Sequence, residues 1–162
     1  VPAEIVLADV AAQVAAGAEH VTFGDPDFLN GPTHALRIAR AATGGTGVIV
    51  TDNAYHGVTL ATAEMSMSIG PAVAPGPTVF PIPAPSAQNY PQGIAEGFAQ
   101  AVTDACDRMA EQGIKPALLI VDTIFSSDGV FPDPKGLLAP AATAITATTI
   151  QRCASENRRA WV

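Results

Sequence analysis

The chain has 162 residues and a formal net charge of −7; 48% of its residues are hydrophobic and only 14% are charged. This length suits one ordinary domain with a buried core, and the negative charge argues against nucleic-acid binding, which needs a basic face. Soluble domains usually carry about 25% charged residues, so the low fraction predicts that part of the surface is covered. A homo-oligomer or an aggregate is therefore expected.

No targeting or membrane segment is visible in the sequence. No apolar run reaches the roughly 18 residues of a membrane-spanning helix, and no basic segment at Val1 marks a signal peptide. We therefore expect a cytoplasmic protein without membrane contact, in which Cys106 and Cys153 are isolated thiols rather than a disulfide. His20 and His34 lack metal-ligand spacing with carboxylates, so no metal site is predicted.

The first predicted elements are a helix and a short strand. Pro2 suits the start of a helix and Gly17 suits its end. A modest apolar face of this helix is expected to consist of Ile5, Ala8, Ala12 and Ala15. Residues 21–23 then predict a strand, followed by turn residues up to Pro32.

The next segment predicts a second helix and a buried strand. The helix is expected from about Pro32 to Thr43, where Gly44-Gly45 would end it. Residues 48–50 are apolar throughout, as in a strand that is covered on both faces.

Prolines dominate residues 70–91, a density that forbids a helix and allows at most an edge strand near Val79-Phe80. The strongest helix follows, from about Gln92 to Gln112. Its apolar residues recur at helical spacing: Ile94, Phe98, Val102, Ala105 and Met109. Residues 117–121 form the clearest strand, and Asp122 follows it into a long loop.

Residues 138–156 have helical length, but their threonines and isoleucines leave helix and strand both open. Strands that alternate with helices predict an incomplete three-layer α/β/α sandwich with a mainly parallel sheet. Ligands bind at the carboxyl ends of such strands. The informative loops are therefore residues 24–31, 51–57 and 122–136.

Two motifs carry a family resemblance: Tyr55-His56-Gly57 after the buried strand, and residues 121–132 after the clearest strand. Over about residues 35–145 the chain resembles the large domain of the class III (fold-type I) pyridoxal-phosphate aminotransferases. The resemblance implies that Tyr55 stacks on the pyridine ring, that His56 lies beside the cofactor, and that Asp122 replaces a longer glutamate. A second interpretation of Asp122, as a cap of its own loop, stays open.

Several parts of that family are absent from the sequence. The phosphate-binding turn is replaced by residues 25–32, where Asp25 and Asp27 would repel a phosphate. The strand whose Asp pairs with the pyridine nitrogen, and the Schiff-base lysine, would follow Ile145. Lys115 and Lys135 match neither position. The resemblance thus implies an amino-transfer fragment with no catalytic residue of its own, which is inactive alone.

Residues 1–38 resemble a different family, the radical S-adenosylmethionine proteins, just beyond their cluster loop. The resemblance rests on residues 16–32, and it implies that Gly24-Asp25-Pro26 contacts the amino group of S-adenosylmethionine through Asp25. The three-cysteine motif that would bind the iron–sulfur cluster is absent. A solvated turn is the simpler interpretation of Asp25 and Asp27.

The sequence therefore divides into a radical-enzyme-like segment (1–38), a partial aminotransferase large domain (39–145) and a tail that resembles neither (146–162). Pyridoxal phosphate is the cofactor implied by the resemblance, and small amino donors and acceptors are the implied partners. The alternatives are a non-enzymatic association domain, a chimeric or mis-joined product, and a remnant of a radical enzyme.

Overall fold

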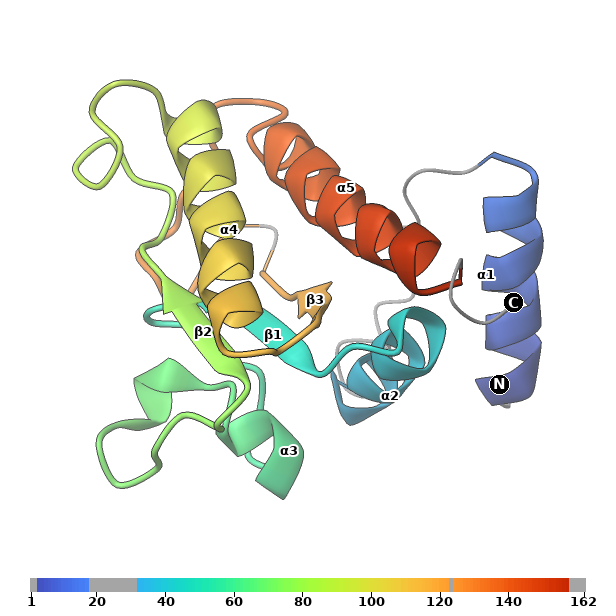
Figure 1. The fold of residues 1–162 in the computed structure, drawn as a ribbon. Helices are drawn as coiled ribbons and strands as arrows, with labels where there is room; N and C mark the ends of the chain where they lie inside the picture. Colours follow the sequence, from blue (N-terminus) through green and yellow to red (C-terminus); the bar gives the residue numbers. More distant parts are fainter. Residues whose placement is uncertain (1–2, 18–31, 123, 158–162) are drawn as a thin grey trace.

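The computed structural model describes residues 3–17, 32–122 and 124–157 (Figure 1). The helices are α1 (Ala3–Ala15), α2 (Pro32–Thr43), α3 (Leu60–Ala63), α4 (Ile94–Glu111) and α5 (Leu138–Asn157), with a 3-10 helix η2 at Met67–Ile69. The strands are β1 (Gly47–Thr51), β2 (Val79–Ile82) and β3 (Pro116–Leu119).

The three strands form one parallel sheet in the order β2-β1-β3. The central strand β1 is buried along its whole length, which explains why its residues are apolar on both faces. β2 lies at one edge, and its Pro81 pairs with Val50. Proline is tolerated at an edge because the outer side of the strand needs no donor, so the predicted edge strand is confirmed.

Alternation along the strands divides the interior into two cores. Ile49 and Phe80 face α4 and α5, where the larger core also contains Phe98 and Val102. The opposite face of the sheet packs against α2 and the α3–η2 segment; its core consists of Leu36, Val48, Val50, Ala54, Met65 and Ile120. Figure 1 shows α4 and α5 side by side, as their mutual contacts require. The α/β prediction with a parallel sheet flanked by helices is confirmed.

The ambiguous segment after residue 137 is a helix, α5. Its Ala141 is fully buried, and Ala144 and Ile145 pack against the larger core beside α4. Tertiary packing therefore overrides the weak helix preference of the β-branched residues.

The predicted apolar face of α1 is wrong. Ile5 is 59% exposed, and Ala8, Ala12 and Ala15 are exposed as well. The partly buried positions are Val6, Leu7 and Val10. α1 contacts α2, so this docking, rather than the small alanine stripe, decides which side is covered.

Some expectations are not addressed by the described residues. The strand at 21–23, His20 and the Asp25–Asp27 turn all lie outside them. Within the described part of the chain, no helix is long and apolar enough to cross a membrane. In the same part, no group of three or more His, Cys, Asp or Glu side chains is arranged to hold a metal ion.

Candidate functional site

The carboxyl ends of the three parallel strands lie at one edge of the sheet. The loop after β1 carries Tyr55 and His56, and the loop after β3 carries Asp122. These three predicted site residues therefore lie at the same edge, where ligands of such sheets bind.

Hydrogen bonds to Thr51 and Ser66 hold the loop after β1 in place. The buried Ala54 donates its amide to the Thr51 carbonyl at 3.1 Å. The His56 amide donates to the Ser66 hydroxyl at 2.8 Å, and that hydroxyl contacts the Gly57 carbonyl oxygen at 2.9 Å. The Tyr55 side chain projects outward and is 54% exposed. The loop thus presents a flat aromatic ring from a fixed backbone.

The imidazole of His56 is partly buried, and its Nε2 atom has no hydrogen-bond partner within the described residues. Burial lowers the pKa of His56 below its ordinary value, and the nearby Asp122 carboxylate opposes that shift. His56 and Asp122 are therefore close enough to interact electrostatically. An unpaired buried ring nitrogen is unusual because its desolvation is not compensated.

The Asp122 carboxylate is hydrogen-bonded within its own loop. Its Oδ1 accepts from the Ile124 amide at 3.1 Å, and its Oδ2 accepts from the Ser126 amide at 2.9 Å and from the Ser126 hydroxyl. Burial acts to raise the pKa of Asp122, but these bonds and His56 outweigh it and hold the pKa below its ordinary value. The loop cap, left open by the sequence, is thus present, and the carboxylate is ionised at neutral pH.

The loop after Asp122 is organised around Phe125. Its carbonyl accepts from the amides of Asp128 (3.0 Å), Gly129 (3.2 Å) and Val130 (3.0 Å). The Phe125 side chain is fully buried in the larger core, so the loop is a compact unit fixed to the body of the domain.

Asp128 joins this loop to the end of β1, and sequence reasoning did not identify it. Its Oδ2 accepts from the Thr51 hydroxyl at 2.7 Å, and its Oδ1 accepts from the Asn53 amide at 3.0 Å. Burial raises the pKa of Asp128 against these two bonds, and Asp52 and Asp122 raise it further. No local pattern could have indicated this contact, because Thr51 and Asp128 are 77 residues apart.

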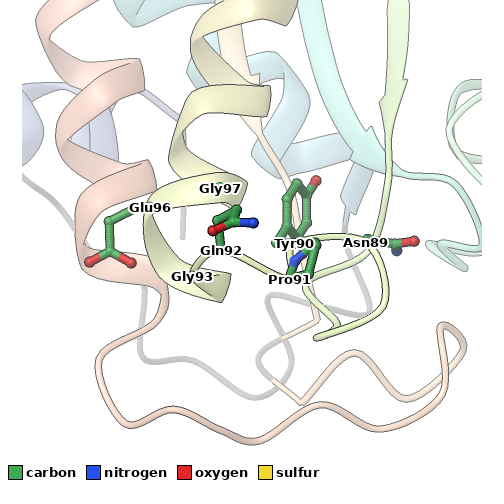
Figure 2. A pocket seen from close by; sticks show the side chains of 7 residues that line it. All are labelled: Asn89, Tyr90, Pro91, Gln92, Gly93, Glu96 and Gly97. Carbon is green, nitrogen blue, oxygen red and sulfur yellow. The ribbon is translucent and has the colours of Figure 1, made fainter.

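A cavity of about 250 Å³ lies at the start of α4. Figure 2 shows the Tyr90 ring and the Glu96 carboxylate on opposite sides of the first turn of α4. The Tyr90 hydroxyl donates to the Pro83 carbonyl at 2.8 Å. Burial, followed by the charge of Asp52, raises the pKa of Tyr90 to about 12. The cavity therefore adjoins the strand-end edge, but Tyr55, His56 and Asp122 do not line it.

The carboxyl-end edge of the sheet suits the pyridine ring of pyridoxal phosphate but not its phosphate group. The exposed ring of Tyr55 offers a flat face on which an aromatic ring can stack. Asp52, Asp122 and Asp128 place negative charge at the same edge, which disfavours a phosphate. Lys115 precedes β3 and so lies at the opposite edge of the sheet, and Lys135 is exposed in the long loop. The described residues therefore fit the ring but not the phosphate.

No protein-family model matches the chain. Its fold matches part of a fold-type I pyridoxal-phosphate enzyme. A solved phospholyase from Arthrobacter, in complex with phosphoethanolamine, superimposes with a TM-score of 0.62 at 30% sequence identity, over 74% of this chain and 29% of that one. A diaminobutyrate–2-oxoglutarate aminotransferase of Rhizobium meliloti (strain 1021) is 28% identical over 127 residues, 70% of this chain and 26% of the relative.

The chain thus has a distant, partial similarity to a class III aminotransferase and to a phospholyase, and spans between a quarter and a third of their lengths. Nothing in these comparisons supports the resemblance of residues 1–38 to radical S-adenosylmethionine proteins, or a chimeric origin. The Gly24-Asp25-Pro26 turn, on which that resemblance depends, lies outside the described residues.

Proposed function

We propose that this chain is part of the large domain of a class III pyridoxal-phosphate enzyme, and that the loops after β1 and β3 face the cofactor ring. The observation that carries the proposal is that Tyr55, His56 and Asp122 lie in loops that follow β1 and β3 at the carboxyl-end edge of one parallel sheet. The similarity to an aminotransferase and to a phospholyase supports the same class. The boundary of this part near residue 39 remains a prediction.

Each of the three side chains has a role in this proposal. The exposed ring of Tyr55 would stack on the cofactor ring, which, when bound, serves as an electron sink for chemistry at an amino-bearing carbon. His56 would lie beside the cofactor, although its Nε2 atom is buried and does not face the ring. Asp122, ionised and fixed by Ser126, would hold negative charge close to that imidazole.

The chain needs further polypeptide to act. Neither Lys115 nor Lys135 matches the family's Schiff-base lysine, and the acidic side chains at the carboxyl-end edge disfavour the phosphate. We therefore propose that the chain is inactive alone and that amino-bearing small molecules are the substrates of the complete protein. Since Asp122 is one methylene shorter than the family's glutamate, both transfer and elimination remain compatible with this edge.

The proposal predicts that the chain binds the pyridine ring of the cofactor without gaining affinity from its phosphate group. Titration of the purified chain with pyridoxal and with pyridoxal phosphate, followed by ligand absorbance, should show that pyridoxal binds at least as tightly. Tyr55→Ala should weaken both ligands, whereas Val58→Ala, a change at an exposed neighbour, should not. Equal binding by wild type and Tyr55→Ala, or no binding of either ring, would contradict the proposed role of this edge.

Covalent attachment is tested separately. The chain is mixed with pyridoxal phosphate and reduced with borohydride, and labelled lysines are mapped by mass spectrometry. We expect no stoichiometric label on Lys115 or Lys135. A fully labelled lysine at either position would show that the chain supplies its own Schiff-base residue.

Association with a second copy is a further candidate function, favoured by exposed apolar side chains in the loop after β1, at the start of α3 and in the loop after β3. Tyr55, Val58 and Leu60 follow β1, and Ile124 and Val130 follow β3; Leu60 is 84% exposed. Apolar side chains that gather on a surface commonly mark an interface. Sedimentation should show a dimer or a larger species that Leu60→Lys shifts toward monomer, and a clean monomer for the wild type would exclude this candidate.

A further inference from the structure

We infer that Asp128 is a positioning residue that holds the loop after β1 against the loop after β3 and thereby sets the placement of His56 relative to Asp122. The inference rests on the proposed function for its relevance to a cofactor, but the bridge itself is a property of the described residues.

The first argument is the geometry of the bridge. The two carboxylate oxygens of Asp128 accept separate hydrogen bonds, from the Thr51 hydroxyl at 2.7 Å and from the Asn53 amide at 3.0 Å. Thr51 is the last residue of β1 and is 1% exposed, so the contact is made to a rigid point. Asn53 lies only three residues before His56. The backbone that leads to His56 is therefore tied directly to Asp128.

The second argument is that Asp128 itself stands on a fixed support. Its amide donates to the Phe125 carbonyl at 3.0 Å, and the Phe125 side chain is fully buried. Asp122 begins the same compact loop and is held in it by the amides of Ile124 and Ser126. The backbone joins His56 to Asn53, and hydrogen bonds then connect Asn53 to Asp128, Asp128 to Phe125 and Phe125 to Asp122.

The third argument is the electrostatic cost of placing a carboxylate at residue 128. Asp128 lies near two further carboxylates, Asp52 and Asp122, and both act against its ionisation. A structural tie alone could use a neutral side chain at a lower cost. A carboxylate, by contrast, accepts two bonds at once and fixes the angle between the two loops, which is what a site shared between them requires.

The test measures the pKa of His56 by NMR, from the titration of its imidazole Cε1 proton. The chain has three histidines, and the loss of one signal in His56→Gln assigns the resonance. Removing the bridge in Asp128→Ala should loosen the loop and expose the imidazole. Burial lowers the pKa of His56 and outweighs the opposing effect of Asp122. Exposure should therefore let the pKa of His56 rise toward its ordinary value of 6.5.

Matched variants separate positioning from general destabilisation. Thr51→Val removes the hydrogen bond from the Thr51 hydroxyl to Asp128 and should raise the pKa of His56 by a smaller amount. Asp107→Ala removes an equal charge from an exposed position on α4 and should leave the pKa of His56 unchanged. If Asp128→Ala does not fold, Asp128→Leu, which has nearly the same shape but accepts no hydrogen bond, gives the same comparison.

An unchanged pKa of His56 in a folded Asp128 variant, with or without a lower melting temperature, would overturn the inference and leave Asp128 as a structural residue. The measurement needs no cofactor, so its outcome is independent of the pyridoxal titrations. Failure of ring binding with a shifted His56 would reject the proposed function and keep the bridge.

Discussion

The ring of Phe125 packs edge-on against the ring of Phe98, with a distance of 5.9 Å between centroids and an angle of 85° between planes. Phe98 makes a similar contact with Tyr90, at 6.2 Å and 78°. Aromatic pairs favour this geometry because the positive ring edge meets the negative ring face. The three rings connect the loop after β3, through α4, to the wall of the cavity in Figure 2.

Truncation of this aromatic contact should destabilise the domain. Phe125→Ala leaves a cavity in a fully packed site, and we expect a loss of about 3–5 kcal/mol in the free energy of unfolding, measured by urea denaturation. Phe125→Leu, which refills most of that volume, should cost clearly less. A loss below about 1 kcal/mol for the alanine variant would mean that Phe125 is not a core residue.

A glycine at residue 130 should stabilise the protein. Val130 has a φ of 64°, a left-handed conformation that strains a β-branched residue by about 1–2 kcal/mol, and its side chain is 55% exposed. Val130→Gly removes the strain, while added freedom of the unfolded chain offsets part of the gain. We expect a net gain of about 0.5–1 kcal/mol, seen as a higher melting temperature.

The control for this prediction is Val58→Gly. Val58 is 73% exposed but is not among the residues with positive φ, so glycine there adds unfolded-state freedom without relieving strain. A lower melting temperature is expected. Equal effects of the two substitutions would show that the conformation of residue 130 carries no strain.

A methyl group at Gly45 should disturb the connection between α2 and β1. An added Cβ atom would lie 2.4 Å from the Pro116 carbonyl oxygen and 2.7 Å from that of Lys115. Both are backbone atoms, so β3 itself would have to move. We expect Gly45→Ala to lower the free energy of unfolding by about 1–3 kcal/mol. Thr46→Ala, at an exposed neighbouring residue, should change it by less than about 0.5 kcal/mol.

The stability of the domain should depend on the protonation of His56. The pKa of His56 is lower in the folded than in the unfolded chain because the imidazole is buried. The folded state therefore binds the proton less tightly, and the contribution of the neutral imidazole is present above pH 6.5 and is lost as the pH falls through the folded-state pKa. Unfolding free energies measured downward from neutral pH should decline.

His56→Gln is the control for this pH dependence. His20 and His34 remain in the variant, so the difference between the two curves isolates His56. The variant should show a shallower decline below pH 6.5. Asp122 does not interfere in this range, because its pKa is held below the ordinary carboxyl value of 3.8. Parallel curves for the two proteins would exclude a buried, neutral His56.

Local signals in the sequence predicted most of the helices and strands. The α2 range of Pro32–Thr43 is confirmed, because proline and glycine residues limit both of its ends. α4 is confirmed within two residues of its predicted start, since its apolar positions recur at helical spacing over several turns. α3 was missed because four residues are too few for any periodicity to appear.

Side-chain partners across the sheet could not be predicted in the same way. The exposure of the α1 alanines depends on how α1 docks on α2, and the helical state of residues after 137 depends on packing against α4. The sequence placed Tyr55, His56 and Asp122 after strands, and parallel pairing with β1 in the centre brings their loops to one edge. Their roles toward a cofactor remain predictions.

Residue type and spacing were sufficient to predict the α/β class, the parallel strands and the proline-bearing edge strand. Folding in three dimensions was needed for the unpaired nitrogen of His56, the burial of Phe125 and the bridge from Asp128 to Thr51. These features depend on contacts between residues far apart in the chain, where no short-range pattern determines which groups meet or how much water they lose.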